Sequence, residues 1–221
     1  MSEFDLDLLR AERTGLDEAL FCAGKTNDQV ARIVEAMAAT GRSMLLTRLD
    51  ESRYAALGGA VRSLLDYEPI SRTAVLGPRR PLSDRARVVV VCAGTSDLPV
   101  SREAARTLEY YGERVSEVND VGVAGLHRLI ARIGDIRAHD IVIAVAGMDA
   151  ALVSVLGGLV RAPVIGVPTS VGYGAARGGE TALAASLASC AAGVVVVNID
   201  NGFGAACAAV RILNRGISLN P

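Results

Sequence analysis

Between Ala86 and Asn214, five short apolar runs alternate with segments of helical periodicity. Strands that are buried on both faces and alternate with helices predict a parallel sheet with right-handed crossover connections. Two glycine pairs, Gly172-x-Gly174 and Gly202-x-Gly204, lack the third glycine of the dinucleotide-binding fingerprint, which favours a flavodoxin-like strand order. We therefore expect an α/β domain with three α/β/α layers and a five-stranded parallel sheet, with strands at residues 88–91, 114–118, 141–146, 164–167 and 194–197 and helices at residues 101–111, 123–133, 150–160, 180–188 and 204–213.

Residues 1–78 have a different pattern, which predicts a small mixed or α-rich N-terminal domain. Thr26 and Gln29 have the spacing of a capping box, and apolar residues at helical spacing follow them. The expected elements are helices over residues 27–40 and 51–65 and short strands over residues 44–47 and 73–76.

The stretch over residues 79–85 combines proline with charged residues and has no periodicity, so it predicts a linker before a domain of residues 86–221. Within the N-terminal part, Gly24-Lys25-Thr26 is similar to the end of a phosphate-binding P-loop. That motif does not fit, because Ala19 stands where its first glycine is required and residues 16–20 are expected to be helical. The role of Lys25, at the start of a helix, stays open: it either contacts an anion or is a solvated surface side chain.

The overall charge argues against a nucleic-acid or membrane partner. Lysine and arginine number 23 against 24 acidic residues, and aromatic residues make up only 4% of the chain. Four cysteines without paired spacing and two histidines support neither a disulfide framework nor a zinc site, so we expect a reducing, cytoplasmic location. Residues 181–199 carry no charge, but Gly193 and the small residues before it favour a buried helix and strand over a membrane span.

Polar and glycine-rich segments follow every predicted strand. In open parallel sheets, ligands bind outside the carboxyl ends of the strands, so these segments are expected to form one site for a small molecule. Gly94-Thr-Ser-Asp97 also opens a helix, where amides and hydroxyls can hold a phosphate while Asp97 either caps the helix or binds a ribose. The five segments are residues 92–97, 119–122, 146–149, 168–174 and 198–204.

Several of these strings resemble one family. The quoted motifs are Gly94-Thr-Ser-Asp-Leu-Pro-Val100, Gly122-Val-Ala-Gly-Leu-His-Arg128, Val145-Ala-Gly-Met148, Val167-Pro-Thr-Ser-Val-Gly-Tyr-Gly174, Val197-Asn-Ile-Asp-Asn-Gly-Phe-Gly204 and, near the N-terminus, Phe21-Cys-Ala-Gly-Lys-Thr26. Together they resemble the LarB-type pyridinium-3,5-biscarboxylic acid mononucleotide synthases. The C-terminal domain is also similar to the aminoimidazole ribonucleotide carboxylases and mutases of purine synthesis.

The resemblance implies the first step in making the nickel-pincer nucleotide cofactor of lactate racemase. In that step the pyridinium ring of nicotinic acid adenine dinucleotide is carboxylated with CO2 or bicarbonate, and its phosphoanhydride is hydrolysed to release AMP. A pyridinium ring is electron-poor and cannot attack CO2, so a nucleophile must first convert it to an enamine-like dihydropyridine. A thiolate suits this role because it adds reversibly and can leave again.

The resemblance assigns the covalent role to Cys190, because the family's cysteine lies in a Ser-Cys-Ala motif and Ser189-Cys190-Ala191 matches it. Cys190 precedes the fifth strand, which places it at the rim opposite the strand exits of its own subunit. A catalytic Cys190 therefore implies a homo-oligomer with sites shared between subunits, as in the octamers of the purine relatives. The residue pattern alone also fits a buried packing role. Cys92, at a strand exit, is the second candidate, and Cys22 and Cys207 are interpreted as packing residues.

Two further catalytic candidates are His127, early on a helix, and Asp149, at the third strand exit. Asp149 stands where the family usually has glutamate, so its reach is one methylene shorter, and Ala150 and Val153 replace the usual glycine and proline. Met148 occupies the place of a histidine in the purine carboxylases. Hydrolysis of the anhydride is expected to need magnesium, with Asp97, Asp149 and Asp200 as candidate ligands.

The fourth exit supplies Thr169 and Ser170 as donors and Arg177 as a partner for a carboxylate or phosphate. Two other functions remain open: a purine-type carboxylase or mutase, and a nucleotide-binding module without turnover. The expected substrate-binding residues are Gly94, Thr95, Ser96, Asp97, Gly147, Met148, Thr169, Ser170, Tyr173, Arg177, Asn198, Asp200 and Asn201.

Overall fold

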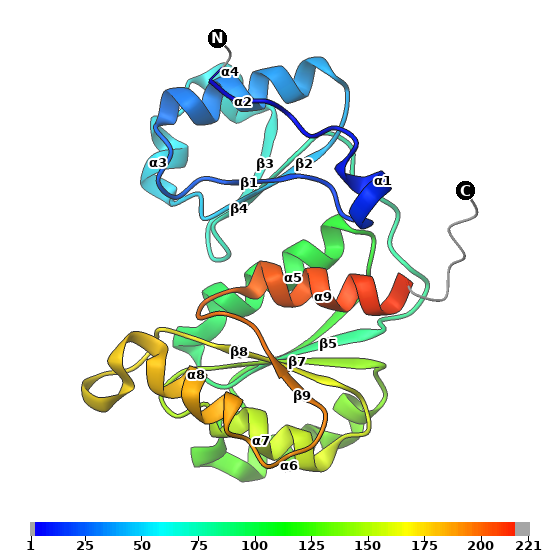
Figure 1. Ribbon diagram of the computed structural model, residues 1–221, viewed down its shortest axis with the longest axis vertical. Coiled ribbons are helices and arrows are strands. Elements are labelled where there is room, and N and C mark those ends of the chain that lie inside the picture. The colour runs from blue at the N-terminus through cyan, green and yellow to red at the C-terminus, as the bar shows by residue number, and fades with distance from the viewer. Residues whose placement is uncertain (1–2, 215–221) are drawn as a thin grey trace. The chain divides into compact units, whose positions relative to one another are not determined.

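The computed structural model describes residues 3–214 (Figure 1). They divide into two compact units, Met1–Pro81 and Leu82–Pro221. Each unit has its own sheet and its own apolar core. The second unit holds the candidate site.

The sheet of the second unit has five strands, all parallel, in the order β6-β5-β7-β8-β9. This confirms the predicted flavodoxin-like architecture. β5 and β7 are buried at every residue because helices cover both faces of the sheet, so these strands read as unbroken apolar runs. The strands are β5 (Val88–Cys92), β6 (Val115–Val118), β7 (Ile141–Ala146), β8 (Val164–Pro168) and β9 (Val194–Val196).

Five helices cover the sheet. α5 (Leu98–Tyr110) and α9 (Gly202–Asn214) lie side by side over one face, and α6 (Leu126–Arg137), α7 (Ala151–Leu159) and α8 (Glu180–Leu187) lie over the other (Figure 1). Leucines and isoleucines of α6 and α7 pack on the valines of β5 and β7. Each such buried side chain contributes about 1.5–3 kcal/mol. Short 3-10 helices at Thr95–Asp97, Val123–Gly125 and Gly174–Gly179 precede α5, α6 and α8.

The charge-free stretch of residues 181–199 forms most of α8 and the edge strand β9, so a helix followed by a strand is correct. The expectation that both are buried is wrong. Leu187 on α8 is 67% exposed and Val195 on β9 is 52% exposed. In the described part of the chain, the helices are too short or too polar to cross a bilayer.

The first unit has a four-stranded sheet in the order β1-β2-β4-β3, in which only the pair β1 and β2 is parallel. The predicted capping box begins α2 (Asn27–Ala39): the Gln29 amide donates to the Thr26 hydroxyl over 3.1 Å, and the Thr26 amide donates to Gln29 Oε1 over 2.9 Å. The strands are β1 (Ala19–Phe21), β2 (Met44–Thr47), β3 (Leu65–Glu68) and β4 (Thr73–Leu76), and a short helix, α1 (Arg10–Thr14), precedes them.

Two predictions for the first unit are wrong. The helix expected over residues 51–65 is split into α3 (Glu51–Ala56) and α4 (Gly59–Ser63), because Leu57 is extended and glycines follow it. Residues 16–20, expected to be helical, lead into strand β1. A strand therefore does precede Gly24-Lys25-Thr26, and the P-loop interpretation fails only on Ala19.

Candidate active site

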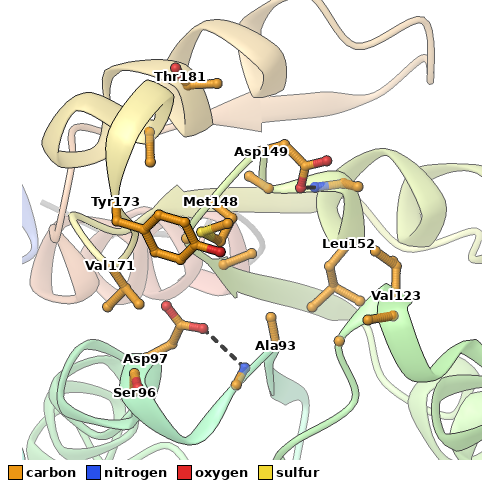
Figure 2. A pocket seen from close by; sticks show the side chains of 18 of the residues that line it. Ala93, Ser96, Asp97, Val123, Met148, Asp149, Leu152, Val171, Tyr173 and Thr181 are labelled. Carbon is orange, nitrogen blue, oxygen red and sulfur yellow. Dashed lines mark hydrogen bonds between the residues drawn. The ribbon is translucent and has the colours of Figure 1, made fainter.

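A pocket of about 930 Å³ opens at the carboxyl ends of β5, β6, β7 and β8 (Figure 2). Of the predicted substrate-binding residues, it brings together Gly94, Thr95, Ser96, Asp97, Gly147, Met148 and Tyr173, and the candidate base Asp149 joins them. Asp120, at the exit of β6, also lines it and was not among the predicted site residues. Its place in the Asn119–Gly122 exit string was the available signal.

Strained backbone accumulates around this rim. Asp120, Met148, Ala150, Arg177 and Asp200 all have positive φ angles, between 48° and 58°. A left-handed conformation at a residue other than glycine is uncommon and unfavourable, and it persists only where the surroundings hold it. These five residues follow β6, β7, β8 and β9, so the strain lies where the sheet topology places a ligand site.

Asp97 forms part of the pocket floor and is only 4% exposed. Its Oδ2 accepts from the Gly94 amide over 3.0 Å, and its Oδ1 accepts from the Thr169 hydroxyl over 2.6 Å. Burial raises the pKa of Asp97, and these hydrogen bonds oppose that rise. Asp97 therefore ties the exit of β5 to the exit of β8, and its side chain does not cap α5.

Gly147 allows the exits of β7 and β8 to approach each other closely. A Cβ atom on Gly147 would lie 2.4 Å from the Val171 carbonyl oxygen and 2.7 Å from Thr169 Oγ1. The Met148 amide donates to that same Val171 oxygen over 2.9 Å. Only glycine fits this position.

One wall of the pocket consists of Met148, Asp149 and Tyr173 (Figure 2). Met148 is 45% exposed and Tyr173 is 81% exposed, so their side chains present apolar and aromatic surface to a ligand. Asp149 accepts from the Ala151 amide over 3.3 Å at the start of α7, which fixes the carboxylate beside that surface. This wall can pack against a planar ring and offer it a carboxylate.

The other predicted binding residues do not line the pocket. Thr169 is buried beneath it, and Asp200 accepts from the Ser170 amide over 2.8 Å. The side chains of Asn198 and Asn201 accept from nearby backbone amides in their own loop. Arg177 is exposed on the 3-10 helix before α8.

The four cysteines differ in their surroundings. Burial, reinforced by the negative charge of Asp97, raises the pKa of Cys92 to about 12, and its Sγ lies 3.2 Å from the Gly94 oxygen. Burial also raises the pKa of Cys22 to about 12, and Cys207 is buried as well. Cys92 is thus protonated at neutral pH, which argues against its role as a nucleophile. Cys190 is exposed.

Cys190 lies in the loop between α8 and β9, before the amino end of β9, and does not line the pocket. The loop packs closely on α7: a Cβ atom on Gly157 would lie 2.7 Å from the Ala191 Cβ atom. Ser189, next to Cys190, is hydrogen-bonded over 2.8 Å to Ser154 of α7. The thiol is therefore held at the rim opposite the pocket of its own subunit.

The two histidines also lie outside the pocket. His127 is exposed in the first turn of α6. The ring nitrogens of His139 are hydrogen-bonded to the Asp135 carbonyl over 3.0 Å and to the Ser116 hydroxyl over 2.8 Å. His139 thus has a structural role.

Within residues 3–214, no three His, Cys, Asp or Glu side chains come close enough together to hold a metal ion. Asp97 is buried and both its oxygens accept hydrogen bonds, and Asp200 does not line the pocket. Asp149 is exposed on the pocket wall. Of the three candidates, Asp149 best fits a magnesium ion that is held mainly by substrate phosphates.

Known proteins match both units. An uncharacterized protein of Methanocaldococcus jannaschii is 37% identical over 90% of this chain and 80% of its own length. N5-carboxyaminoimidazole ribonucleotide mutases of Pyrococcus horikoshii and Pyrococcus abyssi are 33% and 34% identical over 59% and 58% of this chain, in each case 74% of the relative. A PurE2 variant of Treponema denticola aligns with a TM-score of 0.47 and 22% identity, over 61% of this chain and 80% of that one.

Two family matches span nearly the whole sequence. Residues 1–78 match the LarB/PurE-like N-terminal domain, and residues 87–218 match AIR carboxylase. The order of the two domains confirms the family resemblance that the sequence motifs indicated. The chain belongs to the AIR carboxylase family, a family of carboxylases and mutases, and has the LarB-type architecture with its additional N-terminal domain.

Proposed function

We propose that this protein carboxylates the pyridinium ring of nicotinic acid adenine dinucleotide with CO2 or bicarbonate and hydrolyses the phosphoanhydride, releasing AMP. The reaction would be the first step in synthesis of the nickel-pincer nucleotide of lactate racemase. The observation that carries the proposal is the exposure of Cys190, the cysteine of the Ser189-Cys190-Ala191 motif, while the other three cysteines are buried.

The chemistry assigns a separate task to each group. The Cys190 thiolate adds to the pyridinium ring, and the electron pair moves to the ring nitrogen, which gives a neutral enamine. The enamine carbon then attacks CO2 and forms the new carbon–carbon bond. Asp149 takes the proton from that carbon, and the ring regains its aromaticity as the thiolate leaves. Thr95 and Ser96, at the exit of β5, would bind phosphate through hydroxyls and amides.

A catalytic role for Cys190 implies a second copy of the chain, because Cys190 does not line the pocket. Its loop is at the rim opposite the pocket, next to a surface formed by the uncharged residues 181–187 of α8 and by β9. Leu187 and Val195 are more than half exposed on that surface. Such a surface is suited to a subunit contact, so the proposal includes a homo-oligomer such as an octamer, in which one subunit supplies Cys190 to the pocket of another.

Magnesium is part of the proposal for the hydrolysis step. Held by the substrate phosphates and, once carboxylation is complete and Asp149 no longer acts as the base, by Asp149, it would neutralise the charge that develops on the anhydride oxygens. His127 stays a candidate acid or base only if the subunit contact brings it to the substrate, because it does not line the pocket of its own subunit.

The test uses the full-length protein with nicotinic acid adenine dinucleotide, bicarbonate and magnesium. Mass spectrometry should detect a product with one additional carboxylate together with AMP, and intact substrate would sink the proposal. Cys190→Ala should abolish both carboxylation and the covalent adduct. Cys92→Ala is the matched control, since that thiol is buried and protonated. Activity that survives in Cys190→Ala but not in Cys92→Ala would contradict the assignment.

The mutase activity named for the Pyrococcus relatives is the second candidate. Met148 argues against it, because the purine enzymes use a histidine at this place for proton transfer. The same assay with an aminoimidazole ribonucleotide as the substrate distinguishes the two candidate activities. Binding without turnover of either substrate would instead indicate a nucleotide-binding module.

A further inference from the structure

The charge of the pocket lining is one-sided. Three aspartates, Asp97, Asp120 and Asp149, line the pocket, and among residues 3–214 no lysine, arginine or histidine belongs to the lining. The chain as a whole is almost neutral, with a net charge of −1, so the imbalance is local. A pocket that held only the anionic parts of a nucleotide would be expected to present cations to them.

The three carboxylates are not equivalent. Asp97 lies in the floor, where the Gly94 amide and the Thr169 hydroxyl occupy its oxygens. Asp120 forms an ion pair with Arg128 of α6, which offsets its charge. Asp149 is exposed on the wall and accepts from a backbone amide. The negative charge that a ligand meets on the β7–β8 side therefore belongs to Asp149.

An aromatic and polarisable surface accompanies this charge. The side chains of Tyr173 and Met148 lie next to each other in the pocket that Asp149 also lines, and the Asp149 carboxylate is turned toward the start of α7 (Figure 2). The face of a tyrosine ring attracts a cation through its quadrupole, and a carboxylate attracts it by Coulomb forces. A flat cation in the pocket would be attracted by both the Tyr173 ring and the Asp149 carboxylate. A flat neutral ring would gain only the packing contacts.

We infer that the pocket recognises the positive charge of the pyridine ring, with Asp149 and Tyr173 as the specificity-determining residues. The inference rests on the proposed function for the identity of the ring. It predicts that a neutral dihydropyridine is rejected although its shape is almost the same. The carboxylated product, which carries an additional negative charge beside Asp149, should also bind more weakly than the substrate.

The oxidised and reduced forms of nicotinamide adenine dinucleotide are suitable probes, since they differ by one charge on the ring. Affinities should be measured by calorimetry in a Cys190→Ala background, so that covalent addition of the thiol to the oxidised form does not contribute. The oxidised form should bind at least about tenfold more tightly. Asp149→Asn should bring the ratio of the two affinities close to one, and Asp149→Glu should restore it.

Asp140→Asn is the matched control. Asp140 precedes β7 at its amino end and pairs with Arg85 over 2.6 Å, so this variant makes the same change in net charge away from the pocket. It should leave the ratio unchanged. Equal affinity for the two forms, an unchanged ratio in Asp149→Asn, or no binding of either form would overturn the inference. Carboxylation is measured separately: selective binding without carboxylation would sink the proposed function alone, and carboxylation without selectivity would sink the inference alone.

Discussion

Asp97 lines the pocket, but both of its carboxylate oxygens are used to hold neighbouring segments of the pocket together. The motif that contains it predicted a helix cap or a ribose contact. The carboxylate accepts from the Gly94 amide at the start of the 3-10 helix Thr95–Asp97, and through Thr169 it also holds two strand exits together. The partner Thr169 is 72 residues away in sequence, so local spacing carries no signal for this contact. The same limit applies to Gly147, whose missing side chain matters only because the exit of β8 lies against it.

Replacement of Asp97 should therefore change stability with a defined dependence on pH. Burial raises the folded-state pKa of Asp97 above its unfolded value, so the folded chain binds this proton more tightly. The contribution of this proton to the free energy of unfolding is fully present below the unfolded-state pKa, about 4, and is lost as the pH rises through the folded-state pKa. Asp97→Asn keeps an acceptor for Gly94 and does not titrate. Its stability relative to the wild type, measured by urea unfolding between pH 4 and 8, should rise with pH.

The control for this experiment is Asp97→Ala, which leaves the Gly94 amide and the Thr169 hydroxyl without their partner. It should be about 1–3 kcal/mol less stable than Asp97→Asn at every pH in this range, with the same rise relative to the wild type, because it lacks the titrating group as well. An Asn variant that is less stable than the wild type by a constant amount at every pH would contradict the linkage argument.

At the scale of elements, α7 positions the loop that carries Cys190. Gly157 and Gly158 are adjacent on this helix, but only Gly157 faces the loop: a Cβ atom there would lie 2.7 Å from the Ala191 Cβ atom and 2.8 Å from a Val194 methyl, and one on Gly158 would meet nothing within 4 Å. Gly157→Ala should displace the loop, destabilise the protein by about 1–3 kcal/mol and slow adduct formation at Cys190.

Gly158→Ala provides the matched comparison, because it makes the same change in helix propensity without the clash. It should stabilise the protein by about 0.5–1 kcal/mol and leave adduct formation unchanged. Thermal unfolding and the time course of the mass-detected adduct give the two readouts. Equal behaviour of the two variants would show that α7 does not position the loop.

Elements differ in how well the sequence specifies them. β7 begins and ends at the predicted residues, because six buried apolar residues in a row leave little alternative. β1 has three residues, too few for a periodicity to distinguish a strand from a helix. The break after Ala56 depends on how the following leucine and glycines pack, so a regular pattern hid it. The sheet topology predicted the edge of the sheet at which the pocket lies. It did not predict which side chains of the five exit segments face that pocket.

At the scale of the whole molecule, the proposed role of Cys190 implies that one subunit does not hold a complete site. The pocket and Asp149 are at the carboxyl ends of the strands, and Cys190 is at the amino end of β9. A subunit contact through residues 181–187 of α8 and through β9, beside Cys190, would account for the long charge-free stretch. On the proposed mechanism, a lone subunit would bind the ring but would lack the thiol that activates it.

Complementation between subunits tests this arrangement directly. Cys190→Ala and Asp149→Asn homo-oligomers should each be inactive, because every site lacks one of the two groups. When the two variants are co-expressed, some sites combine an intact Cys190 from one subunit with an intact Asp149 from another, and carboxylation should partly recover. If instead each site were built within one chain, the mixture would stay inactive. Sedimentation of the wild type as a monomer, together with full carboxylase activity, would equally contradict the shared site.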